Sequence, residues 1–257
     1  MLSVGARFRK YQCRGMKTLM VFDFDHTIVD ENCDTWVIRS TPDKRLPESL
    51  KKTYEKGRWT EYMGRVMSYV GDQAVTPESI RSVMHTIPFT DGMVELFTFI
   101  SGHKNDIDCI IISDANTLFI DWILDAAGIR PAFDKVFSNP ASIDNRGYVT
   151  VQCYHSHNCV KCPINMCKRK ILEDFIEAQD KAGVEYKWTI YAGDGSNDLC
   201  PLKSMREGDI AMPRKGYTLE RLLLAGVATK DGTALKPRVQ AWTSATEILS
   251  ELKALIQ

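Results

Sequence analysis

The sequence of 257 residues has no excess charge of either sign, because 33 Lys and Arg residues balance 33 Asp and Glu residues. A neutral chain has no overall positive field to attract a nucleic acid or an anionic membrane, so we expect neither as a partner. No apolar run approaches the roughly 18 residues that a membrane-spanning helix needs. The sequence also contains no internal repeat and no low-complexity tract. These absences favour a soluble globular protein.

The sequence also lacks a secretory signal, so we expect its eight cysteines to be reduced thiols rather than a disulfide scaffold. The same absence predicts a cytoplasmic location. The first fifteen residues hold four basic residues and no acid, a composition that also fits a mitochondrial presequence. We favour the interpretation of residues 1–16 as a basic, disordered leader before the fold. The sequence sets no expectation for the oligomeric state.

Short apolar runs that end in polar residues predict strands buried on both faces. These runs are residues 19–22, 110–112, 188–191 and 209–212. Apolar residues at helical spacing lie between them, at residues 94–100, 118–126 and 172–176. Strands that alternate with helices predict the α/β class, with a doubly wound parallel sheet. Such sheets bind ligands beyond the carboxyl ends of their strands, where the polar residues of this sequence lie.

One stretch breaks the alternation and has only helical patterns. Apolar residues around Tyr62 lie on one helix face, and Thr76 followed by proline is typical of a helix start. We interpret this stretch as a cap inserted into the core, and we expect most of its aromatic residues to form the core of the cap. The predicted division is a leader at residues 1–16, a core at residues 17–34 and 90–257, and a helical cap at residues 35–89.

Two carboxylates follow the first predicted strand, in the motif "DFDHT". Asp23 and Asp25 are two residues apart, so both side chains can leave the strand on the same side. Two carboxylates held close together repel, so one must be protonated or a cation must lie between them. One can then attack a substrate while the other handles a proton, and the rigid strand end places both.

Other residues would complete such a site. The motif "GDGSND" adds Asp194 and Asp198, and carboxylate oxygens of this kind suit Mg²⁺. Ser113 can donate a hydrogen bond to a phosphate oxygen, and Lys168 supplies a positive charge. Lys170 competes for that role, but Lys168 better suits the expected start of the helix. Together these groups would neutralise a phosphoryl group during its transfer.

These motifs resemble those of the haloacid-dehalogenase-like phosphohydrolase superfamily. "DFDHT" is similar to its DxDx[TV] signature, "IIISDAN" to its hydroxyl motif, Lys168 to its lysine, and "GDGSND" to its acidic motif. The resemblance covers most of the chain from Lys17 onward. It implies a Rossmann-like core with a helical cap.

The resemblance also implies roles for single residues. Asp23 would be the nucleophile that forms an aspartyl-phosphate, and Asp25 would protonate the leaving alcohol and then activate water. Ser113 and Lys168 would complete the catalytic set. The implied Mg²⁺ ligands are Asp23, Asp25 through its carbonyl, and Asp194, with Asp198 close behind.

A narrower resemblance is carried by "DFDHTIVDENCDTWV", "HSHNCVKCPINMCK" and "GDGSNDLCP". These stretches resemble the branch that contains phosphoethanolamine/phosphocholine phosphatase and pyridoxal phosphate phosphatase, and "PFTDGMVELF" looks closer to the second. In that branch, acids at the positions of Asp34 and Asp114 are assigned to substrate binding. The related phosphoserine phosphatases have a Glu where this sequence has Asn32, which argues against free phosphoserine.

The implied function is therefore hydrolysis of a small phosphorylated metabolite, with pyridoxal 5′-phosphate preferred. Hydrolysis of phosphoethanolamine or phosphocholine is the alternative within enzymes. A protein that binds phosphate without catalysis is the alternative from another class, but the complete set of acids argues against it. A phosphotransferase that shares the aspartyl-phosphate step is a further alternative, which Asp25 disfavours because it would activate water.

Cysteines gather in one further stretch, "CYHSHNCVKCPINMC". Cys159 and Cys162 have the CxxC spacing of zinc ligands, and His157 and Cys167 would complete a tetrahedral set. Structural Zn²⁺ at these four residues is one interpretation. Reduced thiols that merely pack are the second, and redox regulation is the third.

Overall fold

The structure, a computed structural model, describes residues 16–226 and 234–256, so the predicted leader lies outside the described residues except for Met16. The elements in chain order are β1 (Lys17–Phe22), α1 (Cys33–Trp36), η1 (Val37–Ser40), α2 (Glu48–Lys51), α3 (Trp59–Asp72), α4 (Pro77–Met84), α5 (Met93–Gly102), β2 (Ile107–Asn116), α6 (Thr117–Ala126), η2 (Arg130–Ala132), β3 (Lys135–Asn139), β4 (Ala141–Ile143), β5 (Val149–Val151), α7 (Lys168–Lys181), β6 (Tyr186–Gly193), η3 (Ser196–Asp198), α8 (Leu199–Leu202), β7 (Ile210–Pro213), α9 (Thr218–Leu224), β8 (Arg238–Val239) and α10 (Ala245–Ile256). None of these helices is both long enough and apolar enough to cross a bilayer.

A parallel sheet of six strands, in the order β3-β2-β1-β6-β7-β8, runs through the described part of the chain. The chain moves outward from β1 to β2 and β3 and then returns to add β6 on the other side of β1. The direction of winding therefore changes at β1, which confirms the predicted doubly wound sheet. The carboxyl ends of β1, β2 and β6 lie at the same edge, beside this change of direction, where such sheets bind ligands.

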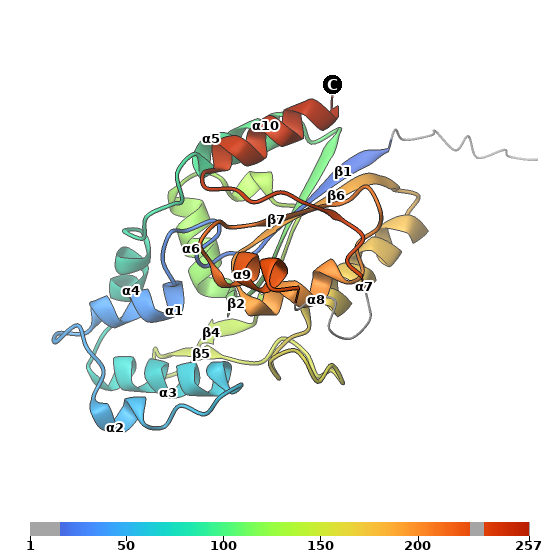
Figure 1. The fold of residues 1–257 in the computed structure, drawn as a ribbon. Helices are drawn as coiled ribbons and strands as arrows, with labels where there is room; N and C mark the ends of the chain where they lie inside the picture. The colour runs from blue at the N-terminus through green and yellow to red at the C-terminus, as the bar shows by residue number, and fades with distance from the viewer. Residues whose placement is uncertain (1–15, 227–233, 257) are drawn as a thin grey trace, which may run out of the picture.

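Helices cover both faces of the sheet (Figure 1). Met20 and Phe22 of β1 belong to an apolar core that includes side chains of α5, α6 and α10. Leu19 and Val21 belong to a second core with side chains of α7, α8 and α9. Successive residues of a strand point to opposite faces, so both faces of β1 need apolar residues. This explains why the strand has an unbroken apolar run.

Helices α1 to α4 lie between β1 and α5 in the chain and form a group at one end of the molecule (Figure 1). The Thr76 hydroxyl accepts a hydrogen bond from the Ser79 N–H at the start of α4, which confirms the predicted N-cap. Helix α3 packs against β5, whose antiparallel pairing with β4 the sequence did not predict. A Cβ atom at Gly71 would approach the Tyr148 ring to 2.5 Å, so only glycine permits this contact.

Candidate active site

A buried lysine joins two of the predicted aspartates. Asp23 follows the last residue of β1 and is 4% exposed, and Lys168, the first residue of α7, is 1% exposed. The Lys168 Nζ atom lies 2.9 Å from Asp23 Oδ1, which also accepts a hydrogen bond of 2.7 Å from the Phe24 N–H. Both hydrogen bonds that the described residues make to this carboxylate therefore go to one oxygen.

Asp198 is held by four donors. Its Oδ1 atom accepts hydrogen bonds from Lys168 Nζ at 2.7 Å and from the Tyr191 hydroxyl at 2.8 Å. Its Oδ2 atom accepts from the backbone N–H groups of Asp194 at 3.2 Å and Gly195 at 2.9 Å. The carboxylate is fully buried, and hydrogen-bond donors satisfy both of its oxygens. Asp198 therefore positions both Lys168 and the turn that carries Asp194.

Three carboxylates form a group suited to a cation. Oxygens of Asp23, Asp194 and Asp198 lie within 4.8 Å of one another. Burial, and then the charge of Asp198, raise the pKa of Asp23 well above its usual value, and the same two causes raise the pKa of Asp194 to about 7. Lys168 supplies only one positive charge to this group. Hard oxygen donors under mutual repulsion fit Mg²⁺, whose charge would offset that repulsion.

The Asp25 side chain lies outside this group of three. Its Oδ1 atom accepts a hydrogen bond of 2.9 Å from the Cys33 N–H at the start of α1. Burial, and then the nearby charge of Asp34, raise the pKa of Asp25 to about 8. A carboxyl group with this pKa is mainly protonated at neutral pH, so it can donate a proton.

Asp34 is 5% exposed and belongs to α1. Burial raises its pKa to about 7, against the opposing effect of a hydrogen bond from Trp59. In that bond the indole Nε1–H donates to Asp34 Oδ2 at 2.7 Å, while the Asn116 side chain donates to Oδ1 at 3.4 Å. Asp34 thus links α1 to both α3 and the end of β2.

A largely apolar cavity of about 220 Å³ lies beside Asp34. Its lining consists of Asp34, Thr35, Ile38, Leu46, Lys51, Tyr54, Trp59, Tyr62, Met63 and Val66. The ring centroids of Trp59 and Tyr62 are 5.5 Å apart, and that of Tyr54 is within 5.8 Å of both. Tyr62 is buried, as predicted for the core of the insert. Trp59 is only partly buried and bonds to Asp34, so the prediction was incomplete for this residue.

Ser113 lies at the same edge of the sheet as Asp23. Phe22 of β1 pairs with Ile111 of β2, so Ser113 comes two residues beyond that pair and Asp23 one residue beyond it. Ser113 is fully buried, and its Oγ accepts a hydrogen bond of 3.2 Å from the Ala115 N–H. This bond leaves the hydroxyl proton available to an anion.

Asp114 also lies near the aspartates. Its Oδ2 atom accepts a hydrogen bond of 3.1 Å from the Asn197 side chain, and its charge contributes to the raised pKa values of Asp23, Asp25 and Asp34. The structure therefore brings the residues predicted from four separate motifs to one edge of the sheet.

Four polar partners were missed by the sequence reasoning. Asn116 and Asn197 lie inside the quoted motifs, but no role was predicted for them. Tyr191 stands in an apolar run that predicts only a strand, and Trp59 read as core. Nothing in the sequence singled out His26, yet its carbonyl accepts a hydrogen bond of 2.6 Å from Arg214. None of these roles has a signature in spacing, because each depends on where the side chains lie in the folded chain. The partners of Trp59 and Asn197, for example, are 25 and 83 residues away.

The four predicted zinc ligands do not come together as a set. The sulfur atoms that lie within 4.8 Å of one another are those of Cys159, Cys162, Cys167 and Cys200. The His157 Nδ1 atom accepts a hydrogen bond of 3.1 Å from the Cys159 N–H, and Nε2 donates to the Pro163 carbonyl at 2.8 Å. Both ring nitrogens are therefore used, and His157 was wrongly included.

Comparisons with solved structures confirm the fold. The chain is similar to phosphoserine phosphatase in its apo form, with a TM-score of 0.53 and 19% identity over 81% of this chain and 98% of the other. It is also similar to a HAD family hydrolase from Salmonella enterica, with a TM-score of 0.62 and 17% identity over 91% of this chain and 70% of the other. These likenesses support the Rossmann-like α/β core that the resemblance to the haloacid-dehalogenase-like superfamily implied.

Sequence comparisons confirm the branch. The chain is 47% identical over 242 residues to the human protein named pyridoxal phosphate phosphatase PHOSPHO2, covering 94% of this chain and all of that protein. It is 38% identical to the human phosphoethanolamine/phosphocholine phosphatase, covering 93% of this chain and 89% of that protein. The family model described as Putative Phosphatase matches residues 18–256. Since the match spans almost the whole chain, the protein belongs to this phosphatase family.

Proposed function

We propose that the protein is a Mg²⁺-dependent phosphomonoesterase that hydrolyses pyridoxal 5′-phosphate through an aspartyl-phosphate on Asp23. The observation that carries the proposal is the buried Lys168, which bonds to Asp23 and Asp198 at once, with the mainly protonated Asp25 two residues from Asp23. A nucleophile, an acid and a positive charge thus lie together at the ligand-binding edge of the sheet.

In the first step, an Asp23 oxygen attacks the substrate phosphorus. We assign Oδ2 as the attacking atom, because Oδ1 is engaged by Lys168 and the Phe24 N–H. A P–O bond forms to Asp23, and the bond from phosphorus to the ester oxygen breaks. Asp25 gives its proton to the departing alkoxide, so an alcohol leaves.

In the second step, Asp25, now ionised, takes a proton from a water molecule. The water oxygen attacks the phosphorus, and the bond from phosphorus to Asp23 breaks. Inorganic phosphate leaves, Asp23 returns to its carboxylate form, and Asp25 is protonated again for the next turnover. Ser113 donates to a phosphoryl oxygen in both steps, and Lys168 offsets the charge that spreads over these oxygens.

Asp23 and Asp194 would hold Mg²⁺, together with the Asp25 carbonyl, and Asp198 would fix Asp194 from behind. When bound, the ion supplies positive charge that keeps Asp23 ionised and neutralises the phosphoryl oxygens. The carboxylate group described above supports this assignment, since its members repel one another without a cation.

We assign residues 35–89 as a cap that selects the substrate. Its cavity offers Trp59, Tyr62 and Tyr54 for contact with a flat aromatic ring, and Asp34 for a protonated ring nitrogen. A pyridine ring fits this combination of rings and one carboxylate. Asp114 would bind the substrate from the core side. The name of the relative with 47% identity supports pyridoxal 5′-phosphate as the substrate.

Phosphocholine or phosphoethanolamine is the second candidate substrate. Aromatic rings beside a carboxylate also suit an ammonium group, through cation–π contact and charge. The relative with 38% identity supports this alternative.

The test is a kinetic panel with purified protein and Mg²⁺. We expect kcat/KM to be highest for pyridoxal 5′-phosphate, and turnover to stop when a chelator removes the divalent cation. Asp23→Asn should abolish turnover, while Asp43→Asn, at an exposed acid in the cap, should not. A preference for phosphocholine would replace the substrate assignment. No phosphate release even from a generic aryl phosphate would instead favour a binding protein without catalysis.

A further inference from the structure

A long loop leads into the active-site lysine. Residues 152–167 connect β5 to α7 without a helix or strand, an unusual length for a structureless loop in a compact domain. Val160 and Ile164 in the middle of the loop are 96% and 48% exposed, whereas Met166 near its end is buried. Apolar burial therefore contributes little to the stretch around the CxxC pair. The loop nevertheless ends at Lys168, which must be placed within hydrogen-bond distance of two carboxylates.

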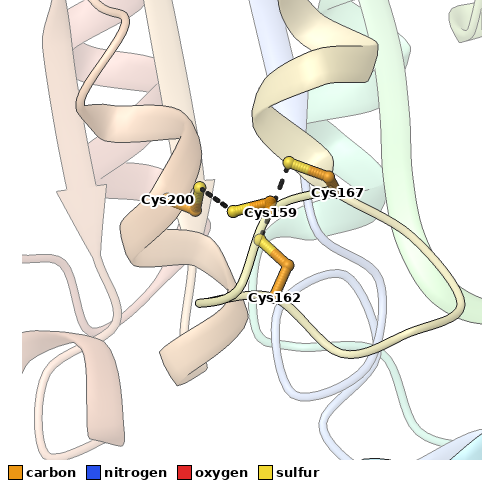
Figure 2. Close-up of side chains that lie close together, drawn as sticks. All are labelled: Cys159, Cys162, Cys167 and Cys200. Carbon is orange, nitrogen blue, oxygen red and sulfur yellow. Dashed lines mark hydrogen bonds between the residues drawn. The ribbon is translucent and has the colours of Figure 1, made fainter. Parts of the chain in front are cut away.

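Four cysteines gather at the base of this loop (Figure 2). Cys159 and Cys162 lie in the loop, Cys167 is the residue before α7, and Cys200 belongs to α8. All four are free thiols with their sulfur atoms within 4.8 Å of one another. Two separate segments of the chain, the loop and α8, therefore direct their thiols to one point.

The distances match a tetrahedron around a metal. The sulfur atoms of Cys159 and Cys200 are 3.9 Å apart, and those of Cys162 and Cys167 are 3.7 Å apart. A tetrahedral site with Zn–S bonds of about 2.3 Å has sulfur–sulfur edges of about 3.8 Å. Disulfide-bonded sulfurs would lie about 2.0 Å apart. Two opposite edges of the group of four sulfurs thus already have the length expected in a four-thiolate zinc site.

Neighbouring groups shape the loop rather than compete for the sulfurs. The turn of the CxxC pair is closed by the Cys162 N–H, which donates to the Cys159 carbonyl at 3.4 Å. The His155 Nε2 atom accepts a hydrogen bond of 3.0 Å from the Cys167 N–H. Arg169 lies beside the sulfurs, at a cavity it lines with Cys159 and Cys167, where its charge would offset the excess negative charge of four thiolates on one Zn²⁺.

We propose that Cys159, Cys162, Cys167 and Cys200 bind one structural Zn²⁺ in a closed tetrahedral site. The ion would tie the loop to the start of α7 and to α8 at once. Cys167 directly precedes Lys168, and Cys200 follows Asp198 by two residues. The zinc would therefore hold the segments that carry Lys168 and Asp198, the two partners of the buried ion pair. It would lie outside the active site and take no part in the reaction.

The test measures zinc in the full-length protein purified under reducing conditions without added metal. We expect one zinc per chain by elemental analysis, and four sulfur neighbours at about 2.3 Å by X-ray absorption. Cys200→Ser should lose the zinc and unfold at a lower temperature. Cys153→Ser, at an exposed cysteine outside the cluster, should keep both properties. Asp194→Asn should also keep its zinc, which separates this site from the group of carboxylates.

Three results would overturn the proposal. One is wild-type protein that folds without stoichiometric zinc. Another is zinc that Asp194→Asn loses and Cys200→Ser keeps. The last is a non-reducing peptide map of the freshly isolated chain that shows two disulfides among the four cysteines. If Cys200→Ser does not fold, Co²⁺ can be exchanged into the wild-type chain to identify the ligands of the metal. Co²⁺ bound by four thiolates absorbs visible light intensely, whereas Co²⁺ bound by oxygen ligands does not. None of these outcomes depends on phosphatase activity.

Discussion

Asp34 makes the stability of the metal-free protein depend on pH. Its folded-state pKa is about 7, compared with an ordinary value of 3.8. The folded state therefore binds more protons than the unfolded state between these values, so stability falls as pH rises through this window. Asp34→Asn removes this ionisation, so the stability of the variant should lack this dependence on pH.

The magnitude follows from the shift of roughly three pKa units. At about 1.4 kcal/mol for each unit, ionised Asp34 destabilises the fold by about 4 kcal/mol above pH 7. Part of this cost is already present at pH 5, because the unfolded carboxyl ionises near pH 4. Between pH 5 and pH 8, the stability of the variant relative to wild type should therefore rise by about 3 kcal/mol. Coupling of Asp34 to Asp25 acts in the same direction.

Urea unfolding of both proteins in EDTA at several pH values measures this difference. The variant also loses one acceptor, since both Asp34 oxygens accept hydrogen bonds in the wild type, and this adds a destabilisation of about 1–2 kcal/mol that is constant with pH. The slope of the stability difference with pH is thus the diagnostic quantity. A stability difference that stays constant from pH 5 to pH 8 would refute the reasoning about burial.

Two further substitutions test other parts of the site. Lys168→Met leaves two buried carboxylates without their cation, so we expect a loss of about 3–5 kcal/mol in metal-free protein by urea unfolding. Lys170→Met, at an exposed lysine, should change stability by at most about 0.5 kcal/mol, and equal losses for the two would contradict the buried ion pair. Trp59→Leu should raise KM for pyridoxal 5′-phosphate severalfold with little effect on an aryl phosphate. An unchanged KM would show that the cavity in the cap does not bind the substrate.

The fold was predictable where one local pattern sufficed. The apolar run before Asp23 and the capping threonine of α4 each carry their signal within a few neighbouring residues, and both predictions hold. The short strands β4 and β5 have three residues each, too few for a period to stand out. Ser113 lies within β2 and not after it, because the strand continues past the apolar run that marked it.

The candidate site was predictable as a set of residues but not as a network. Motif spacing identified Asp23, Asp25, Asp194, Asp198 and Lys168, because these residues follow a strand or begin a helix. Asp34 and Asp114 were assigned only through the family resemblance. The bond from Trp59 to Asp34 and the place of Cys200 among the cysteines each join segments far apart in the chain. Only the folded arrangement of the sheet and its helices brings such partners together, so local patterns carry no sign of them.

The most direct test of the account is to locate the phosphoryl group during turnover. Protein mixed with pyridoxal 5′-phosphate and Mg²⁺ is quenched in acid within one turnover, digested, and mapped by mass spectrometry. We predict an acid-stable, base-labile phosphoryl group on Asp23, absent in Asp23→Asn. A phosphoryl group on another residue, or phosphate release at full rate with no phosphorylated peptide at any time, would contradict the account.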